Sequence, residues 1–118
     1  MRQMANMLMI GVEDVAAARR FYEEGLGWTA WRTGGSGSVM YRIGGALLVF
    51  LAAAFLAAER GVAVPRGGAM SLASFVASRD EVEEAIVRAV AAGAVVTSPA
   101  RDRDGGLYSG YFDDPQGI

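Results

Sequence analysis

The chain has 118 residues, a net charge of −2 at pH 7, no cysteine and no histidine. Its length allows one domain with a single core, its 53% hydrophobic content excludes a disordered chain, and the missing cysteines exclude disulfides and thiol chemistry. Without histidine, the commonest general base and nitrogen ligand for metals is absent, so any chemistry depends on carboxylates, tyrosines, arginines, hydroxyls or the backbone.

The first half of the chain predicts a strand, a helix and three further strands. The apolar run 7–12 has the length of a strand, and Asp14 can cap the helix that follows. The helix has one apolar face, and Gly25 and Gly27 can supply the left-handed conformation that ends it. Three strands are then expected at 28–32, 39–43 and 46–51, with a flexible turn at 33–38 and a hairpin turn at Gly44–Gly45.

The second half repeats this plan after a connecting segment at 52–69 that can hold a short helix. Residues 71–77 alternate as a strand does, and Ser78 with Glu81 has the spacing of a capping box. The apolar stripe of the next helix ends at Gly93. The remaining elements are expected to be strands at 94–97 and 107–112, a polar loop at 101–106 and a turn at 113–117.

The order of the elements predicts an α+β fold made of two βαβββ modules in one domain. Asp14 and Asp80 are 66 positions apart, as are Gly27 and Gly93, so the two halves form a weak repeat. We expect each helix to cover the outer face of its sheet, while the inner faces form a half-open cup. The predicted boundaries are 5–52 for the first module, 53–69 for the connecting segment and 70–118 for the second module.

The second module lacks its last strand, which would begin at Ile118. Either that strand lies outside the sequence or a neighbouring chain supplies the pairing. Because an unpaired sheet edge invites association, we expect a homodimer.

Two motifs carry a family resemblance that covers nearly the whole chain: FYEEGLGW at the end of the first helix and YSGYFDDPQGI near the end of the sequence. With the two modules, they resemble the vicinal oxygen chelate superfamily. That group includes glyoxalase I, extradiol dioxygenases, methylmalonyl-CoA epimerase, and the fosfomycin and bleomycin resistance proteins.

The resemblance implies a divalent metal in the cup, but three of the matching positions do not supply its ligands, and the fourth, a glutamate, would fall three residues beyond Ile118. The ligand of the first strand falls on Met7, the glutamate of the fourth strand on Phe50, and the histidine that opens the second module on about Leu72. Zinc, manganese, iron and magnesium bind nitrogen, oxygen or thiolate. We therefore expect no metal, no other cofactor and no catalytic residue.

An apolar ligand pocket is the expected replacement, because strand alternation points methionines, aromatic residues and a few hydroxyls into the cup. Bleomycin-type members of the family likewise lack the metal and bind drugs in a groove, usually as dimers. The predicted ligand-binding residues are Met7, Met9, Val39, Tyr41, Leu48, Phe50, Leu72, Ser74, Tyr108 and Tyr111.

Each candidate also has a purely structural interpretation. Met7, Met9 and Phe50 can simply fill the core, and the strand tyrosines can be half-buried surface. Trp28 and Trp31 can be packing or dimer contacts. The paired carboxylates of Asp113 and Asp114 fit turn capping better than catalysis, and the alternating charges of residues 101–104 fit a solvated loop.

Three functions remain open. The first is metal-independent binding of a small apolar or aromatic molecule, of the drug-resistance or sequestering type. The second is a superfamily lyase, isomerase or dioxygenase with an atypical site, in which a carboxylate such as Glu13 would have to reach the cup. The third is a dimeric accessory module whose cup is filled.

Other classes of partner are not expected. The eleven basic residues are scattered arginines, so no nucleic-acid site is predicted. The uncharged run 46–58 is too short to cross a membrane. Because the first residues do not have the pattern of a secretion signal, we expect a cytoplasmic protein.

Overall fold

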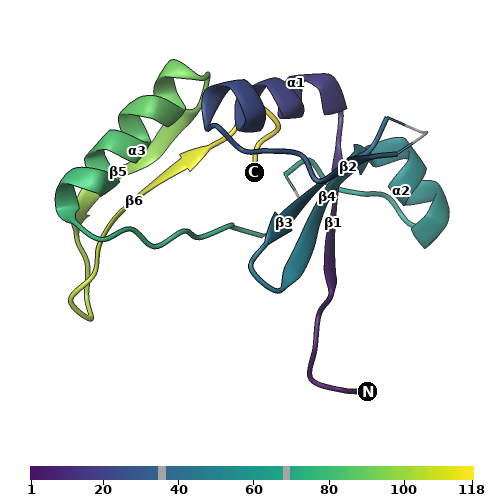
Figure 1. Cartoon of the computed structure of the whole chain (residues 1–118), viewed down its shortest axis with the longest axis horizontal. Coiled ribbons are helices and arrows are strands. Elements are labelled where there is room, and N and C mark those ends of the chain that lie inside the picture. The colour runs from purple at the N-terminus through teal and green to yellow at the C-terminus, as the bar shows by residue number, and fades with distance from the viewer. Residues whose placement is uncertain (35–36, 68–69) are drawn as a thin grey trace.

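The computed structural model describes residues 1–34, 37–67 and 70–118, and it contains two open sheets (Figure 1). The elements of the first half are β1 (Met7–Val12), α1 (Val15–Arg19), the π-helical turn η1 (Arg20–Gly25), β2 (Arg32–Thr33), β3 (Val39–Ile43), β4 (Ala46–Ala52) and α2 (Ala53–Arg60). Those of the second half are α3 (Arg79–Ala91), β5 (Val95–Asp102) and β6 (Tyr108–Asp113).

The four-stranded sheet has the order β1-β4-β3-β2. The prediction of a hairpin is confirmed, because β3 and β4 pair antiparallel around a turn in which Gly44 has φ 60°. β1 joins the sheet beside β4 in parallel. The predicted strand at 28–32 is wrong: β2 begins only at Arg32, because the preceding residues pack Trp28 against the core.

The first helix begins as predicted and ends in an unexpected way. The Asp14 carboxylate accepts a hydrogen bond from the backbone N–H of Ala17. From Arg20 onward the helix widens into a π-helical turn, in which the N–H of Leu26 donates to the carbonyl of Phe21. Gly27, with φ 78°, then turns the chain away.

The second half holds a helix and a two-stranded sheet, β5-β6. Ser78 caps α3 by accepting from the N–H of Glu81, as the sequence predicted. The predicted strand at 71–77 is wrong, because no described strand pairs with this exposed segment. β5 is longer than predicted and runs through Pro99, whose missing N–H is tolerated at a ladder irregularity.

The two halves share one hydrophobic core, because α1, η1 and α3 lie beside one another over the sheets (Figure 1). Gly25 allows η1 to pack closely against the end of α3, since a Cβ at this position would overlap the Cβ of Ala92. Arg88 adds a hydrogen bond of 2.9 Å from its Nε to the Gly25 carbonyl. A contact of this kind leaves little room for a larger side chain.

Helix α2 lies on the opposite face of the four-stranded sheet. Leu56 packs there with Val49 and Leu51 of β4, and a second small cluster forms around them. Within residues 1–34, 37–67 and 70–118, no helix has both the length and the apolar character that crossing a bilayer requires.

Candidate functional site

The cup face of the first sheet is the face opposite α1, and β1 presents methionines there. Met7 and Met9 are 41% and 49% exposed, whereas Ile10 and Val12 are buried in the helix-side core. This alternation confirms the orientation predicted for Met7 and Met9. Their binding role stays a prediction.

The orientation predicted for four other residues is wrong. Val39, Tyr41, Leu48 and Phe50 do share a face, but that face packs against α1 and η1 in the core. The reason is the parallel register of β4 with β1, in which Phe50 lies beside Ile10. Cross-strand neighbours point to the same face, so these side chains follow the helix-facing residues of β1 rather than the methionines.

The predicted residues of the second half are dispersed. Leu72 and Ser74 lie on the exposed segment at 71–77. Tyr108 points toward α3, where its hydroxyl donates to Glu83, so its predicted position in the cup is wrong. Tyr111 is on the other face of β6 and is exposed. Its neighbours are Ser98 on the paired strand and the guanidinium of Arg103, whose Cζ lies 5.3 Å from the ring centre of Tyr111. The predicted residues of the second half therefore do not come together in one site.

One cleft of about 280 Å³ lies on the cup face of β1, between that strand, α2 and the connecting segment. Met9 is the predicted site residue that lines it. The other lining residues were not predicted from the sequence, although the apolar residues on one face of α2 could have indicated some of them. The lining residues are Met9, Ile10, Gly11, Leu56, Arg60, Val64, Pro65 and Met70.

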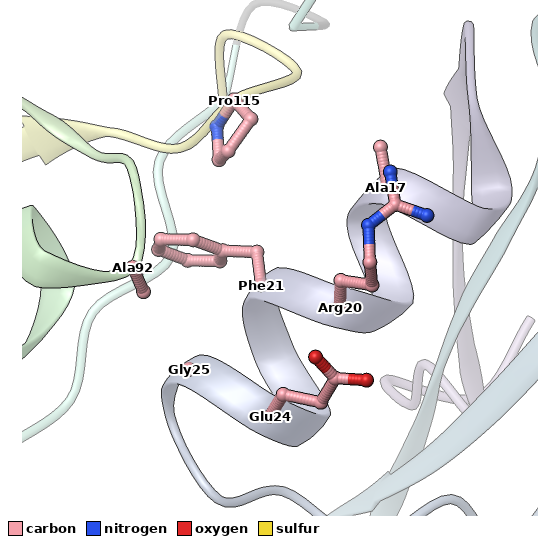
Figure 2. Close-up of a pocket in the computed structure, with 7 residues that line it drawn as sticks. All are labelled: Ala17, Arg20, Phe21, Glu24, Gly25, Ala92 and Pro115. Carbon is pink, nitrogen blue, oxygen red and sulfur yellow. The ribbon is translucent and has the colours of Figure 1, made fainter.

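A second hollow, of about 390 Å³, lies on the outer side of the molecule. Figure 2 shows Phe21 pointing into the seam between the first helix, Ala92 and Pro115, with Arg20 and Glu24 on the helix surface beside it. Phe21 is buried in the shared core. This hollow therefore lies at the contact between the two halves and is not part of the cup.

The carboxylate of Asp114 is buried and holds the C-terminal turn. Its Oδ1 accepts hydrogen bonds from the N–H groups of Gln116 at 2.8 Å and Ile118 at 2.9 Å, and its Oδ2 accepts from the hydroxyl of Tyr22 at 2.7 Å. The interpretation of Asp114 as a turn-capping residue is confirmed. Gln116 in turn accepts from the N–H of Glu13, which ties this turn to the end of β1.

A second cluster of polar side chains joins the first helix to β3. The Nε of Arg19 donates to the Oε2 of Glu23 at 2.6 Å, and the Tyr41 hydroxyl donates to the same oxygen at 3.1 Å. The Arg19 hydrogen bond lowers the pKa of the Glu23 carboxyl below its usual value, and burial raises the pKa of Tyr41. Each partner is satisfied on the helix side of the sheet, away from the cleft.

Comparison with known proteins identifies the family. The sequence profile of the Glyoxalase/Bleomycin resistance protein/Dioxygenase superfamily matches residues 5–118. The chain belongs to this superfamily.

Solved structures agree with the assignment. A glyoxalase-related enzyme from Fulvimarina pelagi is 34% identical, with a TM-score of 0.90 over 98% of this chain and 83% of that one. A glyoxalase/bleomycin resistance protein/dioxygenase from Nocardioides is 25% identical, with a TM-score of 0.78 over 99% and 80%. A lactoylglutathione lyase from Agrobacterium tumefaciens shares the fold at 22% identity, with a TM-score of 0.69 over 99% and 90%. No curated protein matches the chain.

The positions that the superfamily resemblance assigns to metal ligands do not fit a divalent cation. Met7 offers only a thioether, Phe50 is turned into the core, and Leu72 lies on the exposed segment. In the part of the chain that the structure describes, no three carboxylates cluster as a metal would need. On the cup face β4 contributes Val49 and Leu51, which are equally unsuited.

Proposed function

We propose that the protein binds a largely apolar or aromatic small molecule in the cleft on the cup face, without a metal ion, in the manner of sequestering or drug-resistance members of the superfamily. The observation that carries the proposal is the cleft itself, whose walls are methionine and aliphatic residues apart from Arg60. Methionine is flexible and polarisable, and it adapts to differently shaped apolar ligands. The volume of about 280 Å³ lies at the small end of ligand sites and suits a one-ring molecule.

Methionine methyl NMR tests this proposal directly. The neutral probe 4-butylbenzamide is added to protein labelled at the methionine methyl carbons, in the presence of EDTA. We expect the resonances of Met9 and Met70, which line the cleft, to shift, while those of Met1 and Met4 stay in place. Unshifted resonances for both cleft methionines would contradict the proposal.

A matched pair of substitutions sharpens the assignment. Met7 and Met9 share the cup face of β1 and are similarly exposed, but only Met9 lines the cleft. Met9→Ala should weaken probe binding by about fivefold, the equivalent of about 1 kcal/mol of lost apolar contact. Met7→Ala should leave it unchanged, and equal effects would place the ligand elsewhere on the sheet.

An enzymatic function is the alternative, and the relative from Fulvimarina pelagi, described as a glyoxalase-related enzyme, favours it. The carboxylate considered for acid–base chemistry, Glu13, is exposed at the connection between β1 and α1, where its N–H donates to Gln116. Metal-dependent turnover of a superfamily substrate would favour this alternative over sequestration.

We further propose that the protein acts as a homodimer in the cytoplasm. The chain exposes 7810 Å², whereas a compact monomer of its mass would expose about 6,100 Å². The excess resembles the area that one subunit hides in a permanent interface. Much apolar surface lies at 70–77, including Phe75, which is 89% exposed. Sedimentation across the micromolar range should give a dimer, and a monomer throughout would contradict this.

A further inference from the structure

The walls of the cup-face cleft carry a single charged group. Seven of the eight lining residues are apolar, and the eighth is Arg60, the last residue of α2. The acidic neighbour Glu59 does not line the cleft. An apolar site with one positive charge among its lining residues favours a ligand that carries a negative charge.

Arg60 differs from most other arginines of the chain. Across residues 1–34, 37–67 and 70–118, no carboxylate lies within ion-pair distance of its guanidinium, and no hydrogen bond or aromatic ring occupies it. Arginines with such partners are Arg19, Arg32, Arg42, Arg66, Arg79, Arg88 and Arg103. The donors of Arg60 are therefore available to a ligand in the cleft.

We propose that Arg60 makes the cleft selective for an apolar monocarboxylate, a molecule with a hydrocarbon or aromatic body and one ionised carboxyl group. This inference rests on the proposed small-molecule function. The planar guanidinium presents paired N–H donors that match the two oxygens of a carboxylate. A phosphate dianion would leave a negative charge without a partner among the lining residues. The body of the acid would replace water on Met9, Leu56 and Val64.

A structural role of Arg60 predicts something different. A cation in the last turn of a helix stabilises the carbonyl end by a few tenths of a kcal/mol to about 1 kcal/mol. Such a role affects the stability of α2 but gives no preference between ligands. Selectivity between a carboxylate and its neutral isostere therefore separates the two roles.

The test compares 4-butylbenzoate with 4-butylbenzamide, which has nearly the same shape without the charge. Dissociation constants are measured at pH 7 and low salt from the methyl shifts of Met9 and Met70. We expect wild type to bind the acid at least about fivefold more tightly than the amide, and Arg60→Gln to reduce this ratio to near one. Arg20→Gln is the matched control, because Arg20 is also exposed but lines the outer hollow (Figure 2).

The outcomes separate the two proposals. A ratio near one in wild type, with both probes bound, overturns the role of Arg60 and leaves the small-molecule function standing. Failure of both probes to shift the cleft methionines overturns the small-molecule function and the inference with it. Retention of the ratio in Arg60→Gln, with an unchanged thermal midpoint, also overturns the role of Arg60. Arg60→Lys, which keeps the positive charge but not the paired N–H donors, should retain part of the preference for the acid over the amide.

Discussion

Truncation of Phe50 distinguishes the core position seen in the structure from a position in the cup. Phe50 is fully buried, and its ring centre lies 4.9 Å from that of Tyr22 and 5.8 Å from that of Tyr41. Core Phe→Ala substitutions cost about 3–5 kcal/mol, and contacts with two aromatic rings favour the middle of that range or above, about 4 kcal/mol. For a domain of this size we expect the melting temperature to fall by about 15 °C.

Urea unfolding followed by circular dichroism and tryptophan fluorescence measures this loss. The midpoint should fall while the slope stays constant, which shows that stability and not the denatured state has changed. Met9→Ala serves as the control, because a half-exposed side chain should cost less than about 1 kcal/mol. A loss below about 1 kcal/mol for Phe50→Ala, or a specific loss of probe binding with the fold intact, would refute the assignment of Phe50 to the core.

Three further substitutions test the polar groups and the close contact between the halves. Asp114→Ala leaves three donors without their acceptor, including the buried Tyr22 hydroxyl, and should cost about 3 kcal/mol in urea unfolding; a cost near zero would contradict the turn-holding role. The pKa of Glu23 is lowered in the folded state. The stabilisation that Glu23 gives the fold is therefore fully present above the unfolded carboxyl pKa of about 4.5, and it is lost as the pH falls through the lower pKa of the folded state. Glu23→Gln should therefore make the free energy of unfolding depend less on pH in the acid range. An unchanged pH dependence would refute the contribution of Glu23 to stability. Gly25→Ala should cost about 1–3 kcal/mol by overpacking against Ala92, and the additional substitution Ala92→Gly should recover part of it, as a double-mutant cycle would show.

Local signals predicted most of the helices and the hairpin correctly. Asp14 and Ser78 cap helices because a short acceptor side chain at that position bonds the free N–H groups of the first turn. The pair Gly44–Gly45 places the hairpin turn, since Gly44 needs a positive φ. Features of this kind depend on a few consecutive residues, so the sequence alone contains them.

The strand prediction at 71–77 failed for a different reason. The alternating pattern is present, but a strand is defined by hydrogen bonds to a neighbour, and no described strand supplies them. The π-helical turn at Arg20–Gly25 was also missed, because its widening depends on how Phe21 and Tyr22 pack into the core. Both features depend on contacts between distant parts of the chain.

The candidate site shows the same division. Alternation within one strand correctly separated Met7 and Met9 from Ile10, and the missing histidines and the apolar ligand positions were visible in the sequence. Alternation gives two faces but does not say which face a second strand turns to the helix. That choice came from the parallel register of β4 with β1, which sent Phe50 into the core.

The sequence by itself determined the superfamily and the α+β plan, and it showed apolar residues at three positions where the family places metal ligands, because motifs, periodicity and residue chemistry are properties of the chain. The tertiary structure decided which side chains meet in a cleft. Arg60 joins Met9 only because α2 folds back over the far face of the sheet. Strand register and helix docking are set by the burial of apolar surface between segments far apart in sequence, and no local pattern specifies them.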